Sequence, residues 1–255
     1  MTARERERYA PWLLLVIVLV LWEAICRGFG ISEFIFPSPS RIANQLVEFR
    51  GVIAGHAWRT FWVTMVGFGL SIVVGTLLGF VIGSSRMAYA AMYPLMTGFN
   101  AIPKAAFVPI LVVWFGIGVG PAVLTAFLIS FFPITVNIAT GLATIEPELE
   151  DVLRVLGAKR WDVLIKIGLP RSMPYFYASL KVAITLAFVG TTVSEMTAAN
   201  EGIGYLLISA GSSMQMGLAF AGLVVVGAMA MVMYELFAVI EKRTTAWAHR
   251  SAGGA

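Results

Sequence analysis

The sequence contains few residues that could build a metal site, a disulfide or a catalytic centre. One cysteine, Cys26, and two distant histidines, His56 and His249, occur in 255 residues. They cannot form an intrachain disulfide, and they do not suffice for a zinc site or a Cys–His nucleophile pair. No H-E-x-x-H pattern or aspartate pair is present either, so we expect no metal and no intramembrane enzyme.

Charged residues are also scarce. They make up 13% of the chain, hydrophobic residues make up 59%, and the mean hydropathy is +0.86. The apolar runs are long and apolar on all sides, whereas a membrane strand alternates over about ten residues. We therefore predict an all-α integral membrane protein. The net charge of +4 is expected to reflect membrane topology, and no nucleic-acid partner is predicted.

Six membrane spans are predicted. The third is expected to be interrupted by Pro94, Pro103 and Pro109, between a turn at 84–86 and Phe115. Glycines repeat every four residues in the second span, which allows another helix to approach closely. The segment 29–55 is expected outside, with a surface helix at 41–49. The other five spans are expected near residues 12–21, 60–83, 122–142, 175–196 and 216–240.

The distribution of basic residues predicts that both chain ends lie on the cytoplasmic side, because cytoplasmic loops carry an excess of lysine and arginine. Four basic residues fall in the predicted outer segments: Arg27, Arg41, Arg50 and Arg59. Twelve fall on the predicted inner side: Arg4, Arg6, Arg8, Arg86, Arg154, Lys159, Arg160, Lys166, Arg171, Lys242, Arg243 and Arg250.

One long polar run, from Glu146 to Pro170, interrupts the apolar sequence. Apolar residues at helical spacing lie on both sides of Gly157, which predicts a helix-turn-helix. We expect Gly157 to cap the first short helix in a left-handed conformation and Pro170 to end the second. A segment this polar cannot lie in hydrocarbon, so it must dock on something outside the bilayer.

Four residues of this run stand at the spacing G-x9-I-x-L-P: Gly157, Ile167, Leu169 and Pro170. This spacing resembles the EAA loop of bacterial ABC-importer permeases, although the name-giving triplet is replaced by Asp151, Val152 and Leu153. The resemblance implies a type I ABC importer permease fold, with a cytoplasmic coupling helix that fits a groove on the ATP-hydrolysing subunit. It assigns coupling to Glu150, Asp151, Arg154, Gly157, Ala158, Trp161, Ile167, Leu169 and Pro170.

The resemblance extends over most of the chain. The segments 102–118 and 201–206 are similar to the nitrate, sulfonate and taurine subfamily of these permeases. This implies a small organic or inorganic anion as substrate, although some relatives carry vitamin precursors. It also implies a bacterial inner membrane, a second copy of the chain and an external solute-binding protein. We divide the chain into an N-terminal span with its external segment (1–58), the permease domain (59–243) and a cytoplasmic tail (244–255).

The sequence has no phosphate-binding loop of the type G-x-x-x-x-G-K-[ST], because no lysine follows a glycine. If the chain is an ABC permease, it binds no cofactor itself, and ATP and Mg²⁺ belong to a partner subunit. The alternative is an ion-coupled secondary transporter. That class is disfavoured because we find no inverted repeat and no clustered pair of carboxylates.

Two ionisable residues are candidates for the translocation path or a gate. Lys104 lies in the broken third span, where it could attract an anion or mark the inner end of that span. Glu195 lies near the outer end of the fifth span. A carboxylate there would repel anions, so a gate or a role in helix packing is favoured for it.

Overall fold

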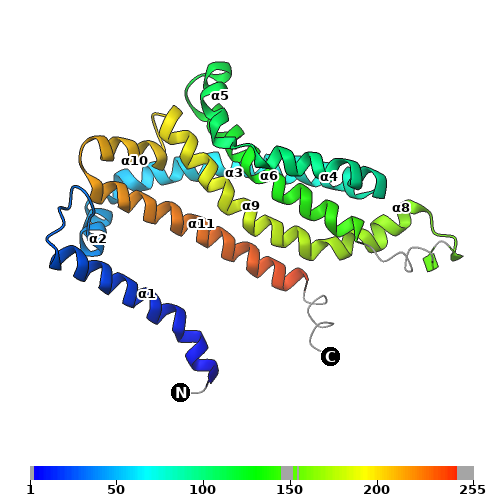
Figure 1. The fold of residues 1–255 in the computed structure, drawn as a ribbon, viewed down its shortest axis with the longest axis horizontal. Helices are drawn as coiled ribbons and strands as arrows, with labels where there is room; N and C mark the ends of the chain where they lie inside the picture. Colours follow the sequence, from blue (N-terminus) through cyan, green and yellow to red (C-terminus); the bar gives the residue numbers. More distant parts are fainter. Residues whose placement is uncertain (1–2, 145–151, 154, 246–255) are drawn as a thin grey trace.

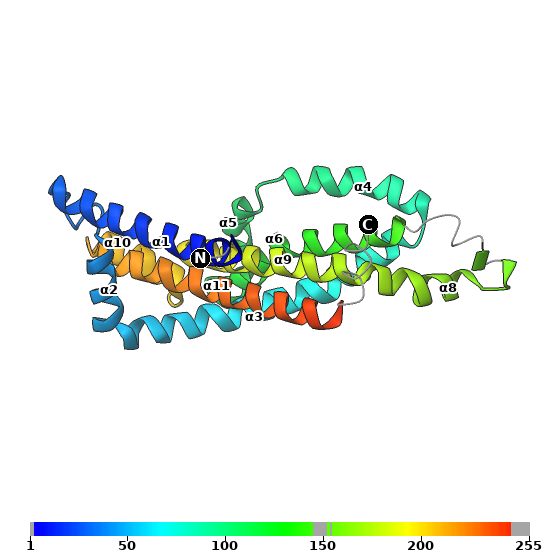
Figure 2. The same cartoon turned by 90° about the horizontal axis from the view of Figure 1, so that it is seen from below.

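The computed structural model describes residues 3–144, 152–153 and 155–245, without the side chains of 3–8, 160 and 161. This part of the chain is helical and contains no strand (Figures 1 and 2). Its helices are α1 (Ala3–Gly28), α2 (Pro39–Glu48), α3 (Arg50–Gly83), α4 (Arg86–Ala101), η1 (Lys104–Phe107), α5 (Val108–Phe115), α6 (Val119–Ala143), α8 (Arg160–Val163), η2 (Leu164–Gly168), α9 (Leu169–Ala198), α10 (Ile203–Ser212) and α11 (Met216–Thr244).

The number of potential spans agrees with the prediction. Five of the described helical segments are long and apolar enough to cross a membrane, and there are six if α4 and η1–α5, which meet at a bend of 71°, are counted together as one span. The second span is longer than predicted, because α3 begins at Arg50 and no proline interrupts residues 50–59. At about 1.5 Å per residue, α3 exceeds a hydrocarbon core of about 30 Å. A helix of this length has turns that extend beyond the hydrocarbon core.

The core is formed by α3, α6 and α9. The predicted glycine ridge of α3 faces α6: a Cβ atom added to Gly79 would lie 2.8 Å from both the Thr135 carbonyl oxygen and Ile138 Cβ. Gly75 and Gly83 are similarly tight against α6. The absence of side chains thus brings the two backbones together, which confirms the packing role predicted for these glycines.

Hydrogen bonds between buried hydroxyls add to this packing. Ser71 on α3 lies 2.7 Å from Ser130 on α6. Thr64 on α3 donates to Thr191 on α9 over 2.9 Å. Such bonds satisfy polar groups where no water competes, and they fix the rotation of each helix against its neighbours.

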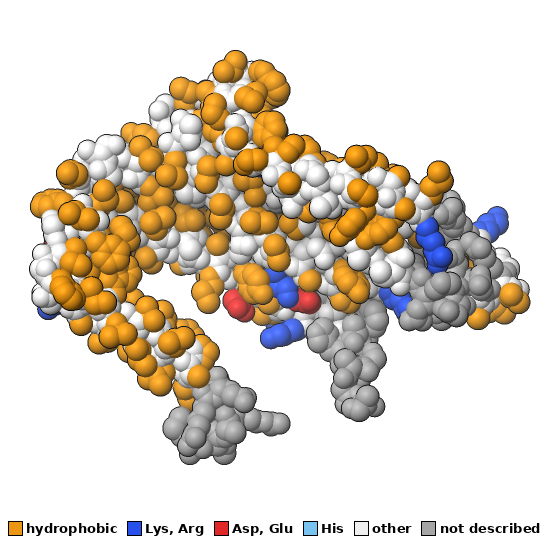
Figure 3. Space-filling view, viewed as in Figure 1, with side chains coloured by type: hydrophobic (Ala, Val, Ile, Leu, Met, Phe, Trp, Pro, Cys, Tyr) orange, Lys and Arg blue, Asp and Glu red, His pale blue; other side chains and the backbone are white. Residues whose placement is uncertain are grey.

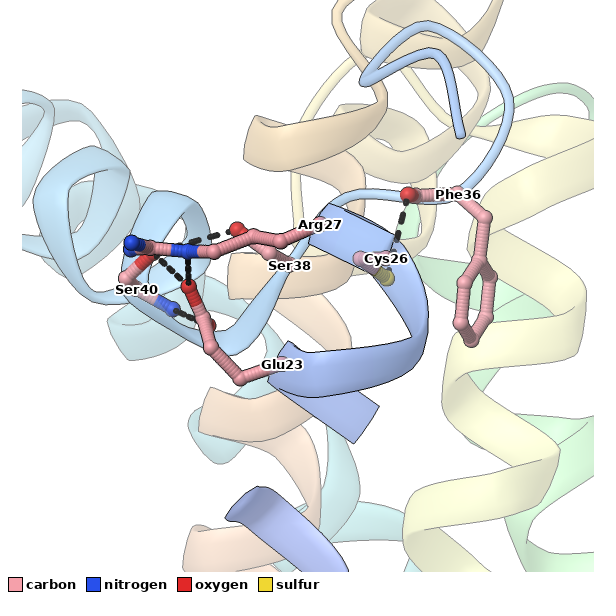
Figure 4. A network of polar contacts seen from close by, with 6 residues as sticks. All are labelled: Glu23, Cys26, Arg27, Phe36, Ser38 and Ser40. Atoms are coloured by element: carbon pink, nitrogen blue, oxygen red, sulfur yellow. Dashed lines mark hydrogen bonds and ion pairs between the residues drawn. The ribbon is translucent and has the colours of Figure 1, made fainter. Parts of the chain in front are cut away.

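The first helix leaves the bundle, and only its C-terminal end lies against the remaining helices (Figure 1). Figure 4 shows this attachment: the Glu23 carboxylate accepts hydrogen bonds from Arg27, over 2.6 Å, and from the Ser40 hydroxyl, over 2.7 Å. It also accepts from the Ser40 backbone N–H over 3.0 Å, at the N-terminus of α2, where a negative charge is favoured. Trp22 stacks on Phe36 beside this network. The end of α1 is therefore fixed, while its apolar length remains exposed.

The bundle has two different ends. The helices α2 and α10 lie at one end, and α8 lies at the other (Figure 1). Hydrophobic side chains cover most of the face seen in Figure 3, and lysines and arginines gather at the α8 end. The chain thus places its predicted outer segment and its predicted coupling segment at opposite ends.

Candidate functional site

The segment after α6 turns sharply at Gly157. Its φ of +84° confirms the predicted left-handed conformation. The backbone N–H of Ala158 donates to the carbonyl of Leu153 over 3.0 Å, the long bond of a Schellman motif. The helical residues 152–153 and 155 therefore end in a glycine cap, as the sequence predicted.

The next helix, α8, has its own N-terminal cap. The carboxylate of Asp162 accepts from the backbone N–H of Lys159 over 3.1 Å, as in half of a capping box. Asp162 also pairs with Lys166 one turn later, at 3.2 Å. The Lys159 N–H, followed by Lys166, holds the pKa of Asp162 below its usual value. Both caps fix the angle at which the chain enters and leaves Gly157.

Pro170 does not end the second helix, so that prediction was wrong. α8 continues through a single π-helical turn, η2, into α9, where Pro170 is the second residue. The Leu169 N–H bonds to the carbonyl of Leu164, five residues back. Proline lacks an N–H and clashes with the carbonyl four residues before it, and the wider turn accommodates both. The second half of the coupling segment is therefore continuous with a membrane span.

The described part of this segment exposes apolar side chains: 57% of Val152, 76% of Leu156 and 45% of Leu169 are accessible. Ala158 and Ile167 are half-buried, and Pro170 is exposed. Three predicted coupling residues, Glu150, Asp151 and Arg154, lie outside the described residues, as does the side chain of Trp161. What is described combines exposed apolar and charged side chains at one end of the bundle.

Lys104 is buried, with 8% of its surface accessible, at the bend of the third span. Its ammonium donates to the Asn100 backbone carbonyl over 3.0 Å and to the Asn100 side chain over 2.8 Å. The rings of Phe99 and Phe132 lie 5.8 and 5.9 Å from it. Since Asn100 belongs to the last turn of α4, Lys104 caps the negative end of that helix and holds the bend.

Glu195 is also buried, with 2% of its surface accessible. The Thr60 hydroxyl of α3 lies 2.8 and 3.0 Å from its two oxygens. The Gly204 N–H of α10 donates to the same carboxylate over 3.0 Å. Glu195 therefore joins three helices. In the described residues no hydrogen bond or ion pair connects it with Lys104, so the two candidate gate residues belong to separate arrangements.

Sequence reasoning missed the partners of Glu195. Thr60 accepts a hydrogen bond from the Ile203 N–H over 2.8 Å, and His56 accepts one from the Gly202 N–H over 3.1 Å. A Cβ atom at either Gly202 or Gly204 would overlap Glu195. The only available signal was the Gly-x-Gly of 202–204, which requires a close approach of the backbone but does not indicate what approaches.

The end of the bundle that holds α2 and α10 also contains two pockets. One, of about 220 Å³, is lined by Arg59, Gly118, Glu195 and Asn200 among others. Arg59 pairs with Glu201 over 3.2 Å near it. The other, of about 590 Å³, is lined by Trp58 and Trp62 of α3. No group of three or more His, Cys, Asp or Glu residues within the described ranges could hold a metal ion.

Comparison with known proteins places this geometry in a family. Residues 71–246 match the protein family described as "binding-protein-dependent transport system inner membrane component". The formylaminopyrimidine transport permease protein ThiX of Halalkalibacterium halodurans is 32% identical over 203 residues, covering 79% of this chain and 81% of that protein. The putative aliphatic sulfonates transport permease protein SsuC of Bacillus subtilis is 25% identical over 249 residues, covering 95% and 90%.

The taurine transport system permease protein TauC of Escherichia coli is 24% identical over 241 residues, covering 91% of this chain and 87% of that protein. Among solved structures, the MetNI methionine ABC transporter in an inward-facing conformation matches with a TM-score of 0.67 and 17% identity. That match covers 78% of this chain and 98% of that chain, and it supports the type I fold. The chain belongs to the binding-protein-dependent transport system inner membrane components, as a permease of the ABC importer type.

Proposed function

We propose that two copies of this chain form the membrane pathway of an ATP-driven importer for a small solute. The observation that carries the proposal is the segment 152–169, which extends from the bundle with apolar side chains exposed and is continuous with the span α9. Such a segment, in a family of importer permeases, fits a groove on a separate ATPase subunit.

The coupling residues are proposed to be those that form or flank the turn: Glu150, Asp151, Arg154, Gly157, Ala158, Trp161, Ile167, Leu169 and Pro170. Gly157 sets the angle of the turn, and the exposed Leu169 and Pro170 lie where the segment joins the span. This chain has no phosphate-binding loop. ATP and Mg²⁺ are therefore proposed to bind the partner subunit, and this chain is proposed to have no enzymatic activity of its own.

A second copy is proposed to cover the third span. None of the residues of α4 is buried within the protomer, and Figure 2 shows most of α4 at the edge of the bundle. At the end of α5, 83% of Val113 and 70% of Trp114 are exposed. This side of the protomer carries the bend at Lys104, so a partner packed here would place the bend near the shared pathway.

The orientation is proposed to be N-in and C-in, in a bacterial inner membrane. Twelve basic residues fall in the segments predicted to be inside, which include α8, and four fall in the segments predicted to be outside. The excess of basic residues at the α8 end follows the positive-inside rule. Solute would then be delivered by an external binding protein at the end that holds α2 and α10.

The substrate is proposed to be a small anion such as a sulfonate or nitrate. One named relative transports aliphatic sulfonates and another taurine, while ThiX transports a formylaminopyrimidine. Lys104 supports an anion, because its ammonium is paired with neutral oxygens of Asn100 and not with a carboxylate. Lys104 is the proposed pathway residue, and of the two roles predicted for Glu195, a gate or helix packing, its bonds to Thr60 and Gly204 favour packing.

Reconstitution in vesicles tests this function. The purified chain alone should give no uptake under a proton or sodium gradient, and uptake of a sulfonate or nitrate panel should require the ATPase, ATP and the binding protein. The control is the same vesicle with the nonhydrolysable analogue of ATP. Robust uptake by the chain alone, driven by a gradient, would show an ion-coupled secondary transporter instead.

A further inference from the structure

We propose that Glu195 and Thr60 form a latch that makes α3, α9 and the start of α10 move as one body at the outer end. The proposal rests on the proposed function, since it names the part of the importer that stays rigid while the pathway opens. Glu195 is then a positioning residue and makes no contact with the solute.

The start of α10 is capped by side chains from other helices. The first backbone N–H groups of a helix have no partner within it. Here the Gly202, Ile203 and Gly204 N–H groups bond to His56, Thr60 and Glu195. All three partners come from other helices. The start of α10 can therefore be satisfied only while α3 and α9 remain in place beside it.

The residues of the latch are buried. Thr60 and Ile203 are completely buried, and Glu195 is nearly so. Without water to replace a lost bond, separating these helices would leave a buried carboxylate and two backbone N–H groups unpaired. The fit is also steric, because the Glu195 carboxylate occupies the space of a side chain at 202, and the Thr192 carbonyl and the Glu195 Cβ occupy that of one at 204. The latch therefore resists both sliding and rotation.

The latch is also connected to the turn between α5 and α6. The Gly118 N–H, in the turn between α5 and α6, donates to the Ala198 carbonyl at the end of α9 over 2.9 Å. The same end of α9 thus holds α10 on one side and the α5–α6 turn on the other. Because α5 follows the bend of the third span, this bond attaches the third span to the body that the latch holds together.

Matched variants of Thr60 test the latch in the complete complex with the ATPase. Thr60→Val keeps the shape and removes the hydroxyl, and Thr60→Ser keeps the hydroxyl. Amide hydrogen exchange of residues 202–204 is measured without nucleotide and after trapping with ADP and vanadate. In the wild type and in Thr60→Ser these amides should be equally protected in both states. In Thr60→Val they should exchange at least about tenfold faster, equivalent to about 1.4 kcal/mol.

Transport measurements separate positioning from simple loss of folding. Thr60→Val should still bind the ATPase and support its basal hydrolysis, because Thr60 lies at the opposite end from α8, while solute uptake falls and Thr60→Ser restores it. Glu195→Gln should behave like Thr60→Val. Wild-type amides that lose protection in the trapped state would overturn the proposal, as would equal exchange and uptake in the valine and serine variants. If the proposed function itself is wrong, trapping with ADP and vanadate leaves the amide exchange of residues 152–169 unchanged even in the wild type.

Discussion

The close contact between α3 and α6 allows us to predict how much stability is lost when a single methyl group is added between them. Gly79→Ala adds a Cβ atom that lies 2.8 Å from both Ile138 Cβ and the Thr135 carbonyl oxygen. Since ordinary contacts begin near 3.4 Å, the helices must separate by about half an ångström at this level. A gap of that size forfeits about a quarter of the dispersion energy of each contact, and overpacking costs about 1–3 kcal/mol.

A matched control lies on the same helix. A Cβ atom at Gly69 meets nothing within 4 Å, and alanine is favoured over glycine in a helix by about 0.5–1 kcal/mol. Gly69→Ala should therefore be neutral or stabilising, whereas Gly79→Ala destabilises. Gly75→Ala, with nearest distances of 3.0–3.1 Å, should fall between them. The order of the three variants follows from distance alone.

Thermal unfolding of the purified protein in detergent measures this order. For a chain of this size, 1 kcal/mol corresponds to about 2–4 °C, so Gly79→Ala should have a midpoint roughly 2–12 °C below that of Gly69→Ala, which has the same gain in helix propensity. Tryptophan fluorescence and loss of the monodisperse peak on size exclusion give independent midpoints. Equal midpoints for Gly79→Ala and Gly69→Ala would refute the close approach of α3 and α6.

Three further predictions concern function. Gly157→Val should abolish docking of the ATPase in a pull-down, because valine resists the left-handed conformation. The control Gly55→Val, at an open helical site, should dock normally. Equal docking of the two variants would contradict the coupling role. Lys104→Met should reduce uptake of anionic and neutral solutes alike if Lys104 only caps α4, and of anions selectively if it faces the path. In a cysteine-free background, a cysteine at Ser38 should react with an impermeant reagent outside intact cells and one at Ala158 should not; labelling at 158 would reverse the orientation.

Features with local causes could be predicted from the sequence. The apolar runs indicated the spans, and the four-residue spacing of small side chains indicated that α3 packs closely against another helix. Gly157 was predictable because a helix followed by glycine and then by another polar helix commonly ends in a left-handed cap. Each of these conclusions needs only a few neighbouring residues, and each agrees with the structure.

Features that depend on distant partners could not be predicted in this way. The bond between Thr60 and Glu195 joins residues separated by 135 positions, and nothing in either neighbourhood indicates the other. Pro170 was misjudged for a different reason. Proline usually stops a helix, but the π turn before Pro170 accommodates both its missing N–H and its clash with the preceding turn. Whether such a turn forms depends on the packing of the entire segment.

The continuity across Pro170 connects the two ends of the molecule. Residues 160–198 form one uninterrupted helical path through α8, η2 and α9, with the capped turn at Gly157 before it and Glu195 near its far end. At about 1.5 Å per residue this path is long enough to cross the bilayer and extend beyond it. Had Pro170 broken the helix, a force applied by the ATPase would be absorbed at a flexible joint. Because the helix continues, the proposed function predicts that a displacement of the coupling segment is passed to the far end of α9, and that the latch at Glu195 carries α3 and α10 with it.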